Sequence, residues 1–429
     1  MGFGFSEEQV HDYIFTRGME ALIVDSNELT EALLFGMGDD PADGGYSEHG
    51  EFKLWKIIKQ RVLSEIDRVH SSIRYGEFVG SKVDLPTDRT RPMQLDLLGQ
   101  YEDGLFVMEL KVEKGSERNA FSELLGYSNY IAQMFAMAGP QDITNVLVAP
   151  MGAKITRNAF LYDLLINNRN VIAYTPVLVG NTLDSLELRL HVPSDEDFRY
   201  LANWLLSHNS MACVVASFSD LEGWYDSHEV DSGVNDYTKT HLDGLCSYTA
   251  QLMEAAQLHG FAFIRKPWEE MPAYYRNSLV ICAINPFFSA DPERAEDVTK
   301  QLDDQNVGSF FELPRLAFDA RLLRLAAKAI SESLAHDQRY ELETPQWATM
   351  VGSLQEVVFT HNFGFRPTGV LREAYVSYLN QLYAGAADGD DEDVSLTKIL
   401  EVQNWMRAWI FMEMCGFTCE KDGPGGADI

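Results

Sequence analysis

Two acidic residues and a lysine interrupt two neighbouring apolar runs between residues 94 and 111. Asp96 lies in the first run, and Glu109 and Lys111 lie two residues apart in the second. Charged side chains are costly to bury unless they are paired or bind a metal ion. Two close carboxylates attract a hard divalent cation. Such a cation beside a lysine is suited to the hydrolysis of a phosphodiester bond.

A turn signal, Asp103-Gly104, separates the two runs and favours a hairpin. Side chains alternate between the faces of a strand, so Glu109 and Lys111 share a face. A two-residue loop at Asp103 and Gly104 places Asp96 opposite Lys111, whereas a loop of residues 101–104 places it opposite Glu109. Both registers gather the three side chains on one face, but a loop of three or five residues would separate them. The alternative interpretation is that these are solvated charges near strand ends.

The residues after Lys111 have the pattern of an amphipathic helix that begins after Ser116, a candidate N-cap. Its apolar stripe recurs at helical spacing and consists of Ala120, Leu124, Tyr127, Ile131 and Met134. Glu123 and Tyr127 are four residues apart, so they share a face that we expect to lie toward the hairpin. Glu123 is then a supporting base, an outer metal ligand or a surface acid, and Tyr127 packs beside it.

This succession of elements resembles the core of the PD-(D/E)xK nuclease superfamily, and within it the NucS-like and Shedu-like nucleases. The likeness covers residues 50–195, less than half of the chain. It is carried by Gln94-Leu95-Asp96-Leu97-Leu98, by Val107-Met108-Glu109-Leu110-Lys111, by the helix from Ala120 to Tyr127 and by the strand-like Asn145 to Pro150. There are two departures, because Leu95 replaces the usual proline and Glu123 stands where many members carry glutamine.

The resemblance implies an α/β fold with a restriction-endonuclease-like core, in which a central mixed sheet is flanked by helices. It also implies metal-dependent cleavage of DNA, in repair or in defence against foreign DNA. Asp96, Glu109 and the Leu110 carbonyl would hold Mg²⁺ or Mn²⁺. Lys111 would orient or deprotonate the attacking water, or stabilise the transition state. The alternative is a nuclease-fold protein without catalysis that serves as an interaction or assembly component.

Sites of this kind often take a further carboxylate from a preceding helix, and we expect Glu51 to supply it. Glu51 opens a helical stretch whose Glu-x-x-Leu-x-x-Ile pattern is similar to the first helix of the family. Glu65, later in this stretch, and Glu77, near the following strand, are the other candidates. Each of the three is also compatible with an ordinary exposed acid.

The charge of the chain argues against tight binding of nucleic acid over its whole surface. It contains 34 Lys and Arg against 65 Asp and Glu, for a formal charge of −31, whereas nucleic-acid enzymes usually carry a basic footprint. Residues 51–120 are nevertheless neutral, with twelve residues of each sign. We therefore expect a local DNA-binding patch made by Lys53, Lys56, Arg89, Arg91, Lys114 and Arg118.

The 429 residues are enough for two or three domains. The expected parts are a helical segment at 1–36, a linker at 37–50, the nuclease-like domain at 51–195, an α/β to α-helical accessory domain at 196–387, and an acidic linker, terminal helix and disordered tail at 388–429. In the accessory domain we expect strands at 212–218 and 279–284 and mostly helices beyond 310. It carries no catalytic spacing, so its expected role is homo-oligomerisation or the binding of a regulatory partner.

No run of 18 apolar residues and no secretion signal is present, so we expect a cytoplasmic protein that does not enter membranes. Five scattered cysteines are typical of a reducing compartment. Cys415 and Cys419 lie one helical turn apart, but buried thiols are a better interpretation than zinc ligands because no further ligands lie nearby.

Overall fold

The structure, a computed structural model, describes most of the chain. The described residues are 4–24, 29, 54–86, 93–113, 119–139, 141–200, 210–219, 236–267, 277–288, 292–302, 304–334, 339–347, 350, 360–387 and 412. The expected linker at 37–50, most of the expected tail at 388–429, and Cys415 and Cys419 lie outside them.

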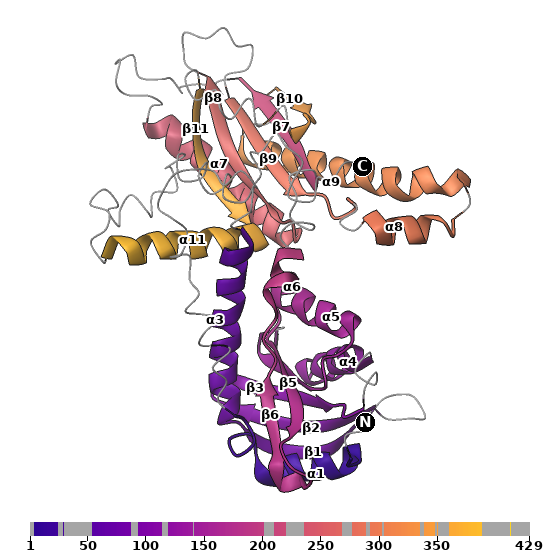
Figure 1. The fold of residues 1–429 in the computed structure, drawn as a ribbon. Helices are drawn as coiled ribbons and strands as arrows, with labels where there is room; N and C mark the ends of the chain where they lie inside the picture. Colours follow the sequence, from indigo (N-terminus) through magenta and orange to yellow (C-terminus); the bar gives the residue numbers. More distant parts are fainter. Residues whose placement is uncertain are drawn as a thin grey trace. The chain divides into compact units, whose positions relative to one another are not determined.

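The chain divides into two compact units. The first comprises Met1–Pro41 and Lys59–Asp195, and the second comprises Ala42–Ile58 and Glu196–Ile429. Each unit contains its own sheet, shown in the ribbon of Figure 1. Helix α1, from the expected N-terminal segment, belongs to the unit that contains the candidate catalytic residues.

The first unit is built on a six-stranded sheet in the order β1-β2-β3-β4-β5-β6. The pairs β3–β4 and β4–β5 are parallel, and the remaining pairs are antiparallel. In chain order the elements are α1 (Glu7–Arg17), α3 (Leu54–Arg74), β1 (Glu77–Leu85), β2 (Met93–Tyr101), β3 (Gly104–Leu110), α4 (Ala120–Ala132), β4 (Ile143–Val148), α5 (Lys154–Leu165), β5 (Val171–Leu178) and β6 (Leu186–Leu190).

Helices cover both faces of this sheet, which is why β4 is buried along its whole length. Helix α3 packs on the face of Tyr174, where His70 hydrogen-bonds its hydroxyl at 3.0 Å. Helices α4 and α5, which connect the parallel strands, lie along the other side in Figure 1. The prediction of an α/β fold with a mixed sheet flanked by helices is therefore confirmed.

The β2–β3 hairpin closes at the pair Tyr101 and Gly104, so its two loop residues are Glu102 and Asp103. The turn thus lies one residue earlier than a loop at Asp103 and Gly104. Gly104 is instead the first residue of β3, with a φ of 151°, and a Cβ there would lie 2.6 Å from the carbonyl oxygen of Asp142. Close backbone approach, rather than the turn itself, requires this glycine.

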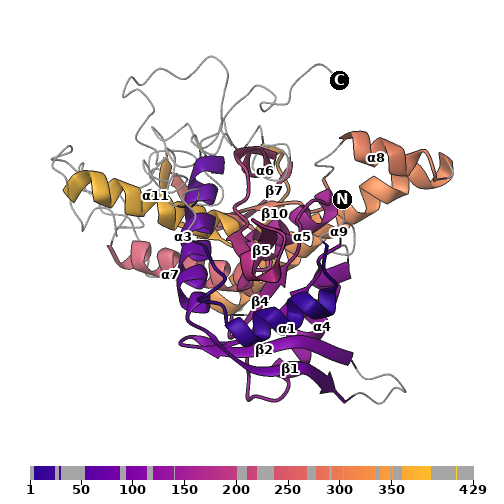
Figure 2. The ribbon, with the colours of Figure 1, turned by 60° about the horizontal axis from the view of Figure 1, so that its bottom comes forward.

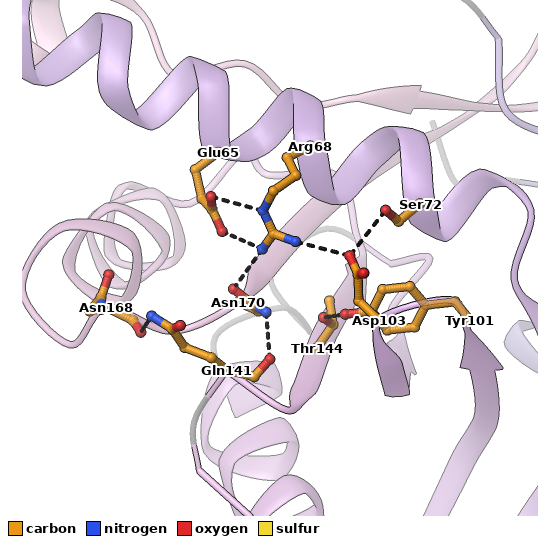
Figure 3. Close-up of polar contacts among 9 residues, drawn as sticks. All are labelled: Glu65, Arg68, Ser72, Tyr101, Asp103, Gln141, Thr144, Asn168 and Asn170. Carbon is orange, nitrogen blue, oxygen red and sulfur yellow. Dashed lines mark hydrogen bonds and ion pairs between the residues drawn. The ribbon is translucent and has the colours of Figure 1, made fainter. Parts of the chain in front are cut away.

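A polar network holds the hairpin turn in place, as Figure 3 shows. Arg68 of α3 forms an ion pair with Asp103 at 3.0 Å, and the Ser72 hydroxyl donates to the same carboxylate at 3.3 Å. Glu65 binds the Arg68 guanidinium at 2.6 Å and orients it. The phenol of Tyr101 lies 2.8 Å from the Thr144 hydroxyl. These contacts fix the turn, and with it the register of the hairpin.

The second unit contains a five-stranded antiparallel sheet in the order β10-β7-β9-β8-β11. Side chains of α7 and α9 share one buried core with one face of the sheet. The other face carries aromatic contacts from Phe365 to Tyr375 of α11. The elements are α6 (Asp195–Tyr200), β7 (Met211–Phe218), α7 (Asp236–Ala255), β8 (Gly260–Pro267), β9 (Asn277–Ile284), α8 (Pro292–Thr299), α9 (Asp304–Ser333), β10 (Tyr340–Glu343), β11 (Thr360–Thr368) and α11 (Val370–Ala387).

Three of these strands were not expected from the sequence. The prediction of mostly helices beyond residue 310 misses β10 and β11, and β8 lies between the two strands that were expected at 212–218 and 279–284. Strand β11 contains a register shift between Phe363 and Arg366 that breaks its alternating pattern. Short or interrupted strands have weak periodicity, so tertiary pairing decides their conformation.

Within the described ranges, no helix combines the length and apolar character that crossing a membrane requires.

Candidate active site

Asp96, within β2, comes together with Glu109 and Lys111 at the C-terminal end of β3. The hairpin pairs Leu97 with Met108, so the next position places Asp96 opposite Glu109. The Asp96 carboxylate accepts a hydrogen bond of 2.9 Å from the Leu110 N–H. The Lys111 ammonium forms an ion pair with the Glu109 carboxylate. The register is therefore the second of the two that the turn allowed, with the polar groups on one face.

Helix α4 contributes Glu123 to the same cluster. Its Oε2 lies 3.0 Å from Lys111 Nζ, so the ammonium contacts carboxylates from β3 and from α4. Glu109 is 3% exposed, whereas Glu123 is 40% exposed. Tyr127, one helical turn after Glu123, is buried beside these acids, whose charges and its own burial raise the pKa of its phenol. The expected face of the helix thus lies toward the hairpin.

Helix α1 supplies a carboxylate that was not expected. Glu7 is half-buried near Lys111 and Asp96, and its carboxylate accepts from the Val112 N–H. Burial raises its pKa, the Lys111 charge opposes this shift, and the Asp96 charge adds to it. One turn later, His11 is buried with its Nε2 3.0 Å from the Asp96 carbonyl oxygen. Both residues belong to the site through α1.

The sequence contains a capping signal for this helix, which lies within the helical segment expected at 1–36. Ser6 and Gln9 form a capping box, with Gln9 N–H donating to Ser6 Oγ at 3.2 Å. Val10, His11 and Ile14 form the buried stripe, and Glu7 continues it at the helical spacing. An acid and a histidine on the inner face of a helix are unusual, and they mark it as a candidate contributor to a polar site.

Burial and neighbouring charge disfavour the charged form of Glu109 in the cluster. Burial and the Asp96 charge raise the pKa of Glu109 to about 9, against the opposing effect of Lys111. Burial would lower the pKa of Lys111, but the hydrogen bond and charge of Glu109, with those of Glu123, raise it above its ordinary value. Burial would likewise raise the pKa of Glu123, but Glu109 and Lys111 lower it. These effects favour the charged form of the more exposed Glu123, and both carboxyls contact the Lys111 ammonium.

The donor set fits a hard divalent cation. Glu109 Oε2 is buried and accepts no hydrogen bond from the described residues. No three His, Cys, Asp or Glu side chains within those residues form a metal-binding group, but Mg²⁺ usually needs only one or two carboxylates and keeps several waters. Asp96, Glu109 and the Leu110 carbonyl can provide such a set, and a cation would compensate the charge that burial disfavours.

The other predicted residues do not join the cluster or cannot be placed. Glu65 binds Arg68 at the turn end of the hairpin, and Glu77 pairs with Gln100 near the same end. Neither alternative to Glu51 therefore lies in the cluster. Gln100, the strand partner of Glu77, lies four residues along β2 from Asp96. Glu51 itself and the DNA-binding candidates Lys53, Arg89, Arg91, Lys114 and Arg118 lie outside the described residues.

Lys56 is the one DNA-binding candidate within the described ranges. It belongs to the second unit, and its ammonium lies 5.9 Å from the centre of the Trp55 ring.

A shallow cavity of about 410 Å³ in the first unit is lined by Tyr75, Tyr101 and Phe135, among others. It lies at the turn end of the hairpin, away from the acidic cluster.

Comparisons with protein-family models, with curated proteins and with solved structures find no significant match. The function proposed below therefore rests on the geometry of Asp96, Glu109 and Lys111.

Proposed function

We propose that the protein is a metal-dependent endonuclease that hydrolyses DNA phosphodiester bonds on a restriction-endonuclease-like core. The observation that carries this proposal is the placement of Asp96 opposite Glu109, with Lys111 beside them and ion-paired to Glu109. Two carboxylates and an ammonium on neighbouring strands form a compact set for holding a cation and a water against a phosphate.

The arrangement of strands also supports the proposal. The candidate residues lie where the antiparallel hairpin β2–β3 joins the parallel strands β4 and β5. The crossover helix α4 returns over the same face and brings Glu123 to Lys111. This order of hairpin, helix and parallel strand is the one that the resemblance to PD-(D/E)xK nucleases implies.

Each residue of the cluster has a distinct role in the proposed reaction. Asp96 and Glu109, with the Leu110 carbonyl, would hold Mg²⁺ or Mn²⁺, and Glu7 would bind one of its waters. Such an ion would supply an acidified water and charge compensation at the phosphate. Lys111 orients the attacking water and stabilises the negative charge of the transition state. Glu123 holds the Lys111 ammonium toward this position.

A nuclease assay on the full chain tests the proposal. Plasmid, single-stranded and flap DNA are incubated with the wild-type protein in Mg²⁺, in Mn²⁺ or in EDTA. We expect cleavage that EDTA abolishes and that Asp96→Ala and Glu109→Gln variants lack. The absence of cleavage of all three substrates by the folded wild-type protein, in either metal, would refute it.

The second candidate function is a nuclease-fold protein that acts as an interaction or assembly component. The net charge of −31 favours it, as does the engagement of Lys111 by two carboxylates at once. In that case the cluster is a structural ion-pair network. A wild-type protein that binds neither Mn²⁺ nor DNA, and whose stability drops in the Asp96→Ala variant, would support this function over catalysis.

A further inference from the structure

His11 connects helix α1 to the backbone of the candidate metal ligand Asp96. Its side chain is 4% exposed, and its Nε2 lies 3.0 Å from the Asp96 carbonyl oxygen, 85 residues away in the chain. A carbonyl oxygen can only accept, so Nε2 carries the hydrogen of this bond. The other ring nitrogen, Nδ1, lies 3.1 Å from Asp12 Oδ1.

Strand β1 has an unusual backbone conformation beside Asp96. Strand β1 pairs Ser81 with Leu97 and Val83 with Leu95, which leaves Lys82 facing Asp96. Lys82 has a φ of 47°, in the left-handed region that residues other than glycine rarely adopt. Its ammonium reaches Glu8 of α1 at 2.8 Å. The neighbouring strand is therefore distorted where the Asp96 carbonyl accepts from His11.

Helix α1 is held over β1 and β2 by several independent contacts, and Figure 2 shows it lying along these strands. Val10 and Ile14 are fully buried on its inner face. Phe15 packs against Phe78 of β1 with ring centroids 6.0 Å apart. These contacts hold α1 in place without His11. The hydrogen bond from His11 to Asp96 therefore has a role other than docking the helix.

We propose that His11 is a positioning residue that holds Asp96 in the geometry that binds the cation. This inference rests on the proposed function. Asp96 is fixed at both ends, because its carboxylate accepts from the Leu110 N–H and its carbonyl accepts from His11. Without the second bond, the backbone at Asp96 faces a distorted strand and can rotate its carboxylate away from Glu109. Groups that orient metal ligands in this way typically change metal affinity by about 10–100-fold when removed.

The test measures binding of Mn²⁺ alone to the full chain by isothermal titration calorimetry. Two loss variants are used, His11→Phe, which retains the ring volume, and His11→Leu. His11→Gln is the rescue variant, because its amide N–H can still donate to the Asp96 carbonyl. His70→Phe is the matched control, since it removes another buried histidine hydrogen bond in the same unit, to Tyr174 at 3.0 Å.

We expect both loss variants to bind Mn²⁺ about 10-fold or more weakly than the wild type, and His11→Gln to recover most of the affinity. His70→Phe should lower the melting temperature but leave Mn²⁺ affinity unchanged. In the cleavage assay, high Mn²⁺ should restore activity to His11→Phe but not to Asp96→Ala.

Two results would overturn the role of His11 while leaving the proposed function intact. The first is wild-type Mn²⁺ affinity in whichever loss variant folds. The second is an equal loss of affinity in His70→Phe, which would assign the effect to general destabilisation. A wild-type protein that neither binds Mn²⁺ nor cleaves DNA would instead refute the proposed function itself.

Discussion

At the scale of single residues, Lys111 is the group around which the candidate site is organised. Its ammonium contacts the buried Glu109 and the more exposed Glu123, and its own side chain is 15% exposed. A cation bound by Glu109 and Asp96 would weaken the pull of Glu109 on Lys111. Glu123 would then remain as the ion-pair partner of the Lys111 ammonium in place of Glu109.

Replacement of Lys111 by methionine should abolish cleavage while largely sparing DNA binding. The variant loses the ammonium that stabilises the transition state, a change that typically costs about 10²–10³-fold in kcat. Single-turnover cleavage and fluorescence anisotropy with labelled DNA measure the two effects separately. Lys59→Met is the matched control, because Lys59 forms a 2.6 Å ion pair with Asp195 outside the cluster. Full cleavage by Lys111→Met would exclude a catalytic lysine.

The pKa of Glu109 predicts a pH-dependent stability for the protein in EDTA. Its folded-state pKa of about 9 exceeds the ordinary value of 4.5, mainly because the carboxyl is buried. The folded state therefore retains a proton that the unfolded chain releases, so this contribution is complete below pH 4.5 and is lost as pH rises through 9. We expect the free energy of unfolding in urea to fall across this range. The decline should be absent in Glu109→Gln, and parallel curves for the two proteins would contradict the assignment.

At the scale of elements, the β2–β3 hairpin decides whether the acids meet, since a shift by one residue would move Asp96 to the opposite face. Its register is held at the turn by Arg68 and Asp103, 3.0 Å apart. Along the strands it is held by Gly99, which pairs with Phe106 and leaves room for the aromatic ring. A Cβ at Gly99 would lie 2.0 Å from that ring.

Substitution of Gly99 by alanine should therefore destabilise the first unit. The added methyl group must displace the Phe106 ring, and overpacking of this kind typically costs about 1–3 kcal/mol. Urea denaturation, followed by the shift of the midpoint at unchanged slope, measures the loss. Gly126→Ala is a control of opposite sign, because its Cβ would meet only Met93 Sδ at 3.9 Å and alanine favours the α4 helix. Equal stability of Gly99→Ala and the wild type would show that the ring adapts.

At the scale of the whole molecule, the charge of −31 sets the conditions under which DNA can bind. Long-range repulsion from the acidic parts slows encounter with DNA, and salt screens this repulsion. Contacts between basic residues and phosphates act in the opposite direction, since salt weakens them. A neutral segment at 51–120 within an acidic chain therefore favours binding through a few local contacts.

The salt dependence of DNA affinity should reveal these contacts. Each phosphate contact contributes about −0.9 to the slope of log affinity against log salt concentration. We expect Lys114→Gln to make the slope about 0.9 less negative. Lys328→Gln, which changes an exposed lysine of α9 paired with Glu332, should leave it unchanged. Fluorescence anisotropy across a salt series measures both, and a wild-type slope near zero would argue against phosphate contacts.

The sequence alone was sufficient for features that depend on short separations along the chain. The pairing of two apolar runs and a helix whose Glu123 face lies toward the hairpin follow from periodicity and a turn signal, and the α/β class was implied by the family resemblance. Such short-range predictions succeed because strand alternation and loop length together restrict where Asp96 can lie relative to Glu109. The choice between the two registers, however, needed the tertiary contacts of Arg68 and the approach of Gly104 to Asp142.

Only the tertiary structure showed that α1 contributes Glu7 and His11. Asp96 lies 85 residues after His11, and no local pattern states which of several helices packs beside a given strand. Glu51 was preferred because the pattern of its helix is similar to the first helix of the family, whereas the structure brings α1 to the site, with Val10 and Ile14 buried and His11 bonded to Asp96. Spacing along the chain therefore predicts the residues that share a hairpin, and the packing of the core decides which distant side chains complete the cluster.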